Sequence, residues 1–425
     1  MSDLTCFKSY DVRGQLGVNL DAPIAYRIGR AFAQVMTPGV TVTGRDVRAS
    51  SAELQAALNE GLLDGGSDVI DIGLCGTEEV YFATTHLGAG GGLEVTASHN
   101  PIDYNGIKMV REGSKPVSGD NGLLDIKALA EAEDWAEAPR GTLSVVDTRD
   151  AYAERVMSFI DLARLRPLKI LVNAGHGVAG PAFDAVAAKL AAAGAPLDFV
   201  TVYHDPDGSF PMGIPNPLLP ENQPQTAEQV RAHGADMGVA WDGDFDRCFL
   251  FDETGAFIDG EYIVGLLAAA FLPKEPGARI VHDPRVMWNT LDVVQKGGGE
   301  AVVSRTGHAL IKAKMREVDG VYGGEMSAHH YFRNFMYCDS GMIPWLLVAE
   351  HMGATGQSLS GLVADMRANF PSSGEINFTL RDAQAAMDRV EAALAPDAIG
   401  GVDRLDGISM AFADWRVNLR KSNTE

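Results

Sequence analysis

The chain has 425 residues, of which 46% are apolar and 22% are charged, a composition typical of a soluble globular protein with about three domains. Its formal net charge of −22 argues against DNA or an anionic membrane as a partner, because the overall field of the molecule repels both. An anionic small molecule can still bind where Arg, Lys and His gather locally, so such clusters are informative.

Cysteine usage and the absence of a targeting signal favour a cytoplasmic protein. The four cysteines form no C-x-x-C pair and are widely spaced, as expected for reduced thiols. The N-terminus carries charge early and has no apolar core of a signal peptide. The longest apolar run, residues 263–272, is too short to cross a bilayer. The sequence makes no prediction of oligomeric state.

Three segments repeat one pattern, in which a β-rich run is followed by a Gly- or Pro-marked loop, an apolar-periodic helix and a further strand. These segments are residues 40–73, 168–202 and 278–307. Strand–helix–strand units of this length predict α/β domains with partly parallel sheets. Residues 361–425 differ, since they predict two helices and then strands, which is an α+β pattern.

The first motif in chain order is "TASHNP", residues 96–101, which follows an apolar run typical of a strand. Taken alone, Ser98 could simply cap a turn. A hydrolytic Ser–His pair is a second interpretation, but adjacent side chains usually point apart, so we expect His99 to be a poor base for Ser98. The sequence also lacks a G-x-S-x-G elbow.

The second motif, "DGDFDR", is the strongest chemical signal. Asp242, Asp244 and Asp246 alternate after the apolar run "MGVAW", so in a strand or turn their side chains share one side. Three converging carboxylates repel one another unless a cation lies between them, and oxygen ligands favour Mg²⁺ or Ca²⁺. An EF-hand loop is disfavoured, because Arg247 stands where that loop needs Gly and the flanks predict strands. A solvated acidic turn without a metal ion is the alternative interpretation of this motif.

Taken together, the two motifs predict a third interpretation of the serine. A serine that carries phosphate needs a cation to neutralise it, and a metal ion held by carboxylates supplies that charge. Mg²⁺ often keeps few protein ligands and takes a phosphate oxygen as another.

Two later motifs concern the substrate. In "GGEMSAHH", residues 323–330, the side chains of Glu325, Ser327 and His329 alternate, which suits sugar hydroxyls and acid–base chemistry, although a capping turn would give the same letters. In "RKSNTE", residues 420–425, an arginine precedes several hydroxyl residues, a pattern that can cradle phosphate or form a polar tail. The segments "SRTGHALIK" and "FKSYDVRG" add local cations.

Together and in this order, these motifs resemble those of the α-D-phosphohexomutase family. "TASHNP" is similar to its phosphoserine loop, "DGDFDR" to its Mg²⁺ loop, "GEMSAHH" to its sugar-binding loop and "RKSNTE" to the start of its phosphate-binding loop. The opening "KSYDVRG" is similar as well, so the resemblance covers essentially the whole chain. It implies an α/β architecture of four domains around a central cleft. We expect three related α/β domains over residues 1–142, 143–250 and 251–358, and a smaller α+β domain over 359–425.

The resemblance also implies an activity, with Mg²⁺ as cofactor and a hexose 1,6-bisphosphate as activator. Phospho-Ser98 gives its phosphoryl group to a hexose phosphate, the 1,6-bisphosphate turns over in the site, and the other phosphate returns to the serine. "GEMSAHH" resembles the phosphomannomutase type, which converts mannose 1-phosphate and mannose 6-phosphate and would supply GDP-mannose formation. Ala328 departs from the glycine usual in that loop.

Residue roles follow the matching motifs. The implied catalytic residues are Ser98, which also contacts the metal ion, Lys108 and His329 as general acid or base, and Arg247 at the serine phosphate. The implied metal ligands are Asp242, Asp244 and Asp246. The implied substrate contacts are Glu325 and Ser327 at the sugar, Arg420, Ser422, Asn423 and Thr424 at the non-reacting phosphate, and Tyr10, Arg13, Arg285 and His308 in support.

The sequence ends at Glu425, within the last motif, whereas family members usually continue with a proline and a second arginine. We therefore expect a truncated fourth domain and a lower activity than that of a complete homologue. The alternatives to a phosphomannomutase are a phosphoglucomutase, a phosphosugar-binding protein with little turnover and, more distantly, a serine phosphatase or hydrolase.

Overall fold

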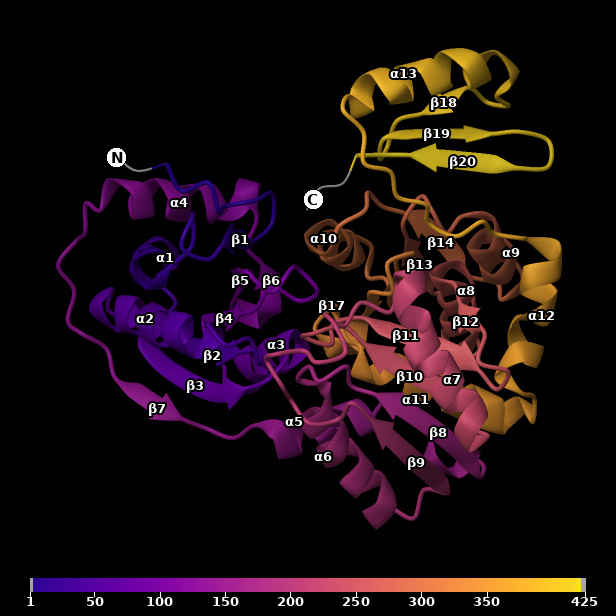
Figure 1. Cartoon of the computed structure of the whole chain (residues 1–425), viewed down its shortest axis with the longest axis horizontal. Helices are drawn as coiled ribbons and strands as arrows, with labels where there is room; N and C mark the ends of the chain where they lie inside the picture. Colours follow the sequence, from indigo (N-terminus) through magenta and orange to yellow (C-terminus); the bar gives the residue numbers. More distant parts are fainter. Residues whose placement is uncertain (1–2, 422–425) are drawn as a thin grey trace.

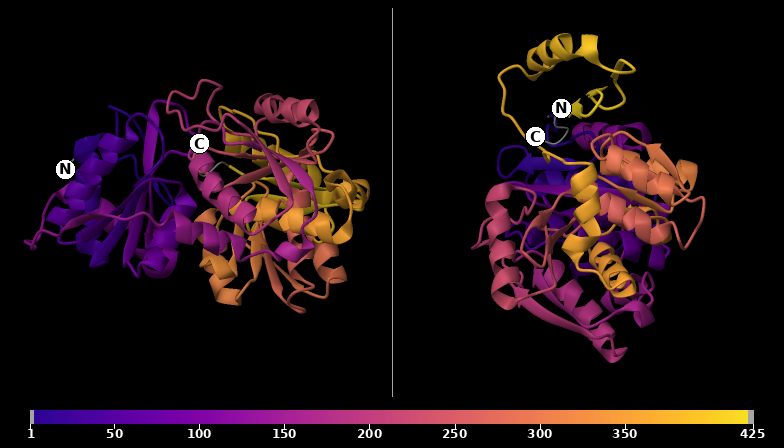
Figure 2. Two further views of the ribbon diagram at one scale, coloured as in Figure 1. Left: turned by 90° about the horizontal axis from the view of Figure 1, so that it is seen from below. Right: turned by 90° about the vertical axis from the view of Figure 1, so that its right-hand side faces the viewer.

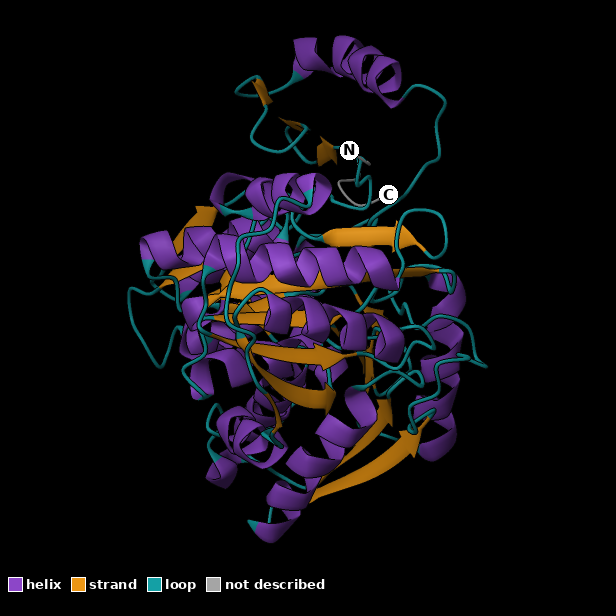
Figure 3. Cartoon of the chain, turned by 90° about the vertical axis from the view of Figure 1, so that its left-hand side faces the viewer, coloured by secondary structure: helices purple, strands orange, loops and turns teal. Residues whose placement is uncertain are grey.

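The computed structural model describes residues 3–421, which form four successive units (Figure 1). The first three each contain a mixed sheet flanked by helices, and the fourth is a small sheet with one helix. Figure 3 shows the helices lying against the strands of the larger units. The predicted class, three α/β units followed by an α+β unit, is confirmed.

The first unit is built on a seven-stranded sheet with the order β1-β5-β4-β2-β3-β7, and β6 pairs with β5. Its strands are β1 (Val12–Gln15), β2 (Val40–Arg45), β3 (Asp68–Leu74), β4 (Gly91–Val95), β5 (Tyr104–Arg111), β6 (Lys115–Pro116) and β7 (Leu143–Val145). Its helices are α1 (Ala22–Met36), α2 (Ser51–Asp64), α3 (Thr77–His86) and α4 (Leu123–Ala132). Strands β2, β3 and β4 are parallel, whereas β4 and β5 are antiparallel.

The second unit has a five-stranded sheet of order β12-β11-β10-β8-β9. Its strands are β8 (Leu168–Asn173), β9 (Leu197–Val202), β10 (Met237–Trp241), β11 (Cys248–Asp252) and β12 (Phe257–Ile258), and its helices are α5 (Arg149–Met157), α6 (Ala179–Ala192) and α7 (Gln223–His233). Strand β10 is buried over its whole length, as expected for a central strand that is covered on both faces.

The third unit repeats this arrangement, with the order β14-β13-β15-β16-β17. Its strands are β13 (Arg279–His282), β14 (Glu300–Val303), β15 (Tyr322–Gly324), β16 (His330–Phe332) and β17 (Cys338–Asp339). Its helices are α8 (Gly260–Phe271), α9 (Trp288–Lys296), α10 (His308–Val318), α11 (Met342–Thr355) and α12 (Leu359–Asn369).

The fourth unit contains α13 (Ala383–Leu394) and the antiparallel strands β18 (Val402–Asp403), β19 (Ile408–Ala411) and β20 (Arg416–Leu419). It projects from the rest of the molecule beyond the third unit (Figures 1 and 2). The segment 371–382, which leads into it, contains no helix or strand.

The three predicted strand–helix–strand units are β2-α2-β3, β8-α6-β9 and β13-α9-β14, so each is confirmed. The predicted domain intervals remain predictions. Sheet membership groups residues 12–145, 168–258, 279–339 and 402–419, so β7 joins the first sheet and β12 the second.

The largest apolar core spans the second and third units. Trp345 of α11 lies 5.9 Å from the ring of Phe183 of α6 and also packs on Phe199 of β9. Tyr81 and Phe82 of α3 join the same core, whereas most of the first unit has a core of its own. The second and third units therefore form one body, and α3 contributes to its core from the first. Within residues 3–421, no helix combines the length and apolar character needed to cross a membrane.

Candidate active site

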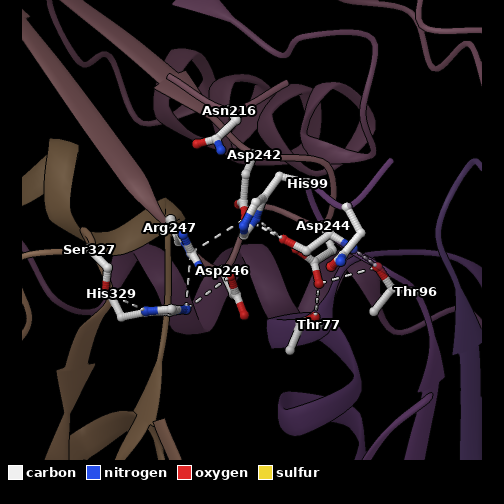
Figure 4. Close-up of polar contacts among 12 residues, drawn as sticks. Thr77, Thr96, His99, Asn216, Asp242, Asp244, Asp246, Arg247, Ser327 and His329 are labelled. Carbon is white, nitrogen blue, oxygen red and sulfur yellow. Dashed lines mark hydrogen bonds and ion pairs between the residues drawn. The ribbon is translucent and has the colours of Figure 1, made fainter. Parts of the chain in front are cut away.

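Three loops with the same local topology meet where the first three units contact one another. Residues 96–103 join β4 to β5, residues 242–247 join β10 to β11, and residues 325–329 join β15 to β16, each time between antiparallel strands. The last two loops contact directly, because Arg247 and His329 pair in an isolated antiparallel bridge. These loops carry the three motifs predicted from the sequence, and Figure 4 shows their side chains facing one another.

The aspartate loop forms a buried carboxylate cluster. Asp242, Asp244 and Asp246 each offer an oxygen within 4.8 Å of the others, and all three are at most 3% exposed. On each of them the buried Oδ1 accepts no hydrogen bond. Buried carboxylate oxygens without a donor are costly unless a cation occupies the space between them. The residues present therefore fit a divalent metal ion with oxygen ligands.

Lys108 of β5 lies against this cluster. Its Nζ donates to Asp244 Oδ2 at 2.6 Å, to Asp246 Oδ2 at 2.5 Å and to Thr77 Oγ1 at 3.1 Å. Burial lowers the pKa of Lys108, but the two carboxylates outweigh it and hold that pKa above its ordinary value. The lysine is therefore an ammonium ion in this arrangement.

The pKa values of the aspartates differ with their neighbours. Burial raises the pKa of Asp242, and the charge of Asp246 adds to that rise. Burial also pushes the pKa of Asp246 upward, but Lys108 and His329 outweigh it and hold that pKa well below its usual range. Of these two aspartates, Asp246, which contacts Lys108, therefore keeps its charge more strongly.

Ser98 faces the aspartate loop. Its Oγ donates to Asp242 Oδ2 at 2.5 Å, and its amide donates to Thr96 Oγ1 at 2.9 Å. Ser98 has a φ of 48°, in the left-handed region that non-glycine residues rarely adopt. This backbone turn aims the hydroxyl at the second unit, 144 positions further along the chain.

The expectation that His99 points away from Ser98 is wrong. His99 Nδ1 lies 2.9 Å from Ser98 Oγ. It also lies 3.5 Å from Asp242 Oδ2 (Figure 4). Adjacent side chains point apart in extended backbone, but the left-handed turn at Ser98 removes that constraint. Burial lowers the pKa of His99 well below its ordinary value, and Arg247 and Arg13 lower it further. His99 is therefore a neutral imidazole beside the serine.

His329 connects the sugar-loop motif to the aspartates. Its Nε2 lies 3.4 Å from Asp246 Oδ1 and 3.3 Å from Arg247 Nε, while its Nδ1 lies 3.4 Å from Glu325 Oε2 and 3.3 Å from Ser327 Oγ. Burial and Arg247 lower the pKa of His329, but Asp246 and Glu325 raise it to about 9 overall. The imidazole is therefore protonated near neutral pH and can donate a proton. Arg247 Nε also lies 3.7 Å from Asp242 Oδ2.

The predicted supporting residues fall into two groups. Tyr10 packs edge-on against His308, with ring centroids 6.1 Å apart, and Arg13 donates to Asn100 of the serine loop at 2.6 Å, so these three adjoin the site. Arg285 instead pairs with Asp283 at 2.6 Å and with Glu375 at 2.5 Å, and Arg420 pairs with Asp406 at 3.3 Å. Ser422, Asn423 and Thr424 lie outside the described residues.

Sequence reasoning did not select two threonines that hold the cluster. Thr77 Oγ1 donates to Asp244 Oδ2 at 2.7 Å, and Thr96 Oγ1 lies 3.3 Å from the same oxygen (Figure 4). Thr96 stands in the predicted loop and could have been found by its place before Ser98. Thr77 begins α3, far from any motif, and only the packing of the first unit on the second reveals it.

Comparisons with known proteins give the same assignment for most of the chain. Three family models match, described as phosphoglucomutase/phosphomannomutase alpha/beta/alpha domain I over residues 5–137, domain II over 150–255 and domain III over 259–370. A protein of Salmonella montevideo named phosphomannomutase is 60% identical over 428 aligned residues, covering 100% of this chain and 94% of that protein. One of Vibrio cholerae, also named phosphomannomutase, is 54% identical and covers 100% and 93%.

Solved structures also resemble the chain. The crystal structure of a phosphoglucomutase/phosphomannomutase family protein from Burkholderia thailandensis superposes with a TM-score of 0.87 at 32% identity, covering 100% of this chain and 92% of that one. The architecture and the motif order therefore agree with a single family over the whole length.

Proposed function

The chain belongs to the phosphoglucomutase/phosphomannomutase family, and we propose that it is an isomerase that interconverts α-D-mannose 1-phosphate and D-mannose 6-phosphate. Relatives at 54–60% identity over the full chain carry the name phosphomannomutase, which favours mannose over the alternative of glucose. The observation that carries the proposal is Ser98 Oγ, placed 2.5 Å from one carboxylate of a buried metal-binding cluster.

The reaction begins with phosphorylated Ser98. The bond between Ser98 Oγ and phosphorus breaks as a bond forms between that phosphorus and the free hydroxyl of the hexose phosphate, giving a hexose 1,6-bisphosphate. The bisphosphate turns over in the site, and its other phosphoryl group returns to Ser98 Oγ. A bisphosphate added from outside activates the enzyme by the same second step, because it phosphorylates unmodified serine.

Asp242, Asp244 and Asp246 would hold Mg²⁺ through the oxygens that accept no hydrogen bond. That ion would neutralise charge on the transferring phosphoryl group. Arg247, beside Asp242, would contact the serine phosphate.

We assign proton transfer to Lys108 and His329, both of which carry a proton in the described arrangement. Each can donate a proton to the oxygen that leaves phosphorus, and the proton that the attacking hydroxyl releases restores the donor. Glu325 and Ser327, next to His329, would bind sugar hydroxyls. Arg420, Ser422, Asn423 and Thr424 would bind the non-reacting phosphate. Tyr10, Arg13, Arg285 and His308 would support the substrate.

We propose a cytoplasmic location, since the four cysteines are free thiols, as expected in a reducing compartment. The partner is a phosphorylated hexose, and we propose no nucleic-acid or membrane partner, in keeping with the net charge of −22.

Phosphorus NMR tests the proposed function. Mannose 1-phosphate is incubated with the protein, Mg²⁺ and a catalytic amount of glucose 1,6-bisphosphate, beside a Ser98→Ala control. We expect a mannose 6-phosphate signal to grow with the native chain and not with the Ser98→Ala control. Free phosphate instead would identify a phosphatase. In a parallel sample that contains glucose 1-phosphate in place of mannose 1-phosphate, conversion of the glucose substrate alone would identify a phosphoglucomutase. Binding of either sugar phosphate without turnover would identify a phosphosugar-binding protein.

A further inference from the structure

Arg48 lies in the short loop between β2 and α2 and extends beneath the serine loop. The residue is 3% exposed. Its Nη1 donates to the carbonyl oxygens of Pro101 at 2.8 Å and Tyr104 at 3.1 Å, and its Nη2 donates to those of Ser98 at 3.0 Å and Asn100 at 2.6 Å. One guanidinium thus binds four carbonyls between the serine and the start of β5.

These four hydrogen bonds act where the backbone has little support of its own. Residues 98–103 belong to no strand or helix, and Ser98 adopts the left-handed conformation. A residue stays in that strained region only where its surroundings hold it there. Because Arg48 Nη2 binds the carbonyl of Ser98 itself, it fixes the peptide plane that follows the reactive hydroxyl.

Arg48 is itself held in place from below. Asp46 Oδ2 lies 3.6 Å from its Nε, and Asp46 Oδ1 accepts from the Arg48 amide at 2.9 Å and from Ser51 Oγ at 2.5 Å. Ser51 in turn accepts from Asn105 of β5 at 3.0 Å. The guanidinium is therefore oriented before any substrate binds.

The second unit closes the other side of Arg48. The ring of Phe210, in the loop between β9 and α7, lies 5.7 Å from the guanidinium carbon, within cation–π distance. In the same loop, a Cβ on Gly208 would lie 2.2 Å from the carbonyl oxygen of Val47, so the two backbones touch there. Arg48 thus contacts the serine loop of the first unit and an aromatic residue of the second.

We propose that Arg48 is a positioning residue for phosphoryl transfer: its guanidinium holds the Ser98 loop by four carbonyls, and Phe210 makes this hold depend on the contact between the first two units. This inference rests on the proposed function. Transfer requires Ser98 Oγ at a fixed place relative to Asp242, and an error of about 1 Å can cost about 100-fold in rate. Lysine cannot replace this arginine, since an ammonium is a point donor without the planar fork.

The test compares Arg48→Lys with Arg45→Lys, a matched control whose guanidinium donates to Gln55 of α2 at 3.3 Å. Turnover of mannose 1-phosphate is followed by phosphorus NMR, and phosphorylation of Ser98 by glucose 1,6-bisphosphate in a single turnover is followed by intact-protein mass. We expect Arg48→Lys to lower kcat and the phosphorylation rate together by about 30-fold, with KM changed less than about threefold. Arg45→Lys should change neither rate.

Two further measurements separate positioning from a loss of folding. Guanidinium ion at millimolar concentration should restore part of the kcat of Arg48→Ala but not that of Ser98→Ala. Phe210→Leu, which keeps an apolar side chain but removes the ring, should lower kcat about threefold at unchanged KM. These outcomes remain readable even if Arg48→Lys is poorly folded.

A native kcat in folded Arg48→Lys would overturn the inference, as would an equal loss in Arg45→Lys or a rise in KM at constant kcat. An inactive native chain would instead overturn the proposed function, and with it this inference. The native chain in the same assay therefore distinguishes the two failures.

Discussion

Lys108 is the residue whose position has the strongest electrostatic consequence. Its ammonium lies 2.6 Å from Asp244 and 2.5 Å from Asp246, among three buried carboxylates. A buried charge that loses its partner is strongly destabilising, by about 3–5 kcal/mol. In the absence of metal, the lysine therefore supplies part of the charge that a divalent ion would supply.

We predict that Lys108→Met lowers the thermal stability of the metal-free protein and makes Mg²⁺ raise the melting temperature more than it does in the native chain. Methionine has a similar length but no charge. Without the ammonium, the repulsion among the carboxylates is larger, so a bound Mg²⁺ stabilises the variant more than it stabilises the native chain. Differential scanning fluorimetry with and without Mg²⁺ measures both effects. Lys296→Met, at an exposed pair with Asp292, is the control. An Mg²⁺ shift no larger than that of the native chain would refute the argument.

Gly243 sets the distance between the aspartate loop and the serine loop. A Cβ at this position would lie 2.5 Å from the carbonyl oxygen of Ser98, which is closer than real Cβ contacts allow. We predict that Gly243→Ala moves Ser98 away from Asp242 and lowers kcat by about tenfold or more. Gly119→Ala, whose Cβ would meet nothing within 4 Å, should keep native activity. Steady-state kinetics of both variants measure this, and an equal kcat in Gly243→Ala and Gly119→Ala would contradict the prediction.

At the residue scale, the sequence was sufficient wherever a motif is local. The spacing of Asp242, Asp244 and Asp246 predicted a shared side, which the structure confirms. The sequence does not predict that Lys108 lies among these carboxylates. The position of Lys108 follows from its pairing with Glu94 across β4 and β5 and from the packing of the first unit on the second. The prediction for His99 fails for a related reason, since the left-handed φ of Ser98 is a property of the folded loop.

At the scale of elements, α3 is one of the parts that link the first unit to the other two. The amide of Thr77 at its start donates to the carbonyl of Asp244 at 3.2 Å. The next residue, Glu78, accepts from Ser340 Oγ at 2.9 Å, from the Gly341 amide at 2.5 Å and from the Tyr152 hydroxyl of α5. One buried carboxylate thus joins α3 to α5 and to the N-terminus of α11.

This junction predicts a pH-dependent stability. Burial raises the pKa of Glu78 to about 8, against the opposing effect of its hydrogen-bond donors, whereas the unfolded value is about 4.5. A carboxyl group that keeps its proton only in the folded state stabilises the fold below pH 4.5, and this contribution is lost as the pH rises toward 8. Between pH 6 and pH 8, the loss is about 2 kcal/mol.

We predict that Glu78→Gln is less stable than the native chain at pH 6, because the NH₂ group of the glutamine would face the hydrogen-bond donors that surround Glu78. We expect the difference in unfolding free energy between the two chains to shrink by about 2 kcal/mol at pH 8. Urea unfolding monitored by tryptophan fluorescence measures it, since Trp241 and Trp345 are buried in the core that joins these units. Glu60→Gln, at an exposed carboxylate of α2, should show no such convergence. A difference independent of pH would contradict the prediction.

The strand–helix–strand units were predictable because their signals are local, namely apolar runs, helical periodicity and loop residues. Strand β7 was not, since its three residues are exposed and it is a strand only through its pairing with β3. The entry of Tyr81 and Phe82 of α3 into the core of the second and third units was equally hidden, because nothing in their periodicity says which sheet they will meet.

At the scale of the whole molecule, the four units are held together unequally. The second and third share one apolar core, which α3 of the first unit joins through Tyr81 and Phe82. The fourth buries few large apolar side chains, among them Ile408 and Met410. Its described contacts with the third unit include a hydrogen bond from Arg416 to the Arg285 carbonyl at 3.4 Å and one from the Thr306 amide to Asp406 Oδ2 at 3.4 Å. Polar contacts of this kind stabilise an interface weakly.

Limited proteolysis tests whether the fourth unit is the most weakly attached. The segment 371–382 has no regular structure, and its apolar side chains are solvent-exposed, with Phe378 76% exposed. Proteases cut where the backbone opens at little cost in free energy. We predict that dilute chymotrypsin cuts first after Phe378 and leaves residues 1–378 as a persistent fragment, identified by intact mass. Phe378→Ser should delay this cut without changing the melting temperature of the remaining body. A first cut between the first and second units, in residues 137–148, would mean that the first unit is the loosely held part, and the bonding of α3 would then be weaker than its hydrogen bonds indicate.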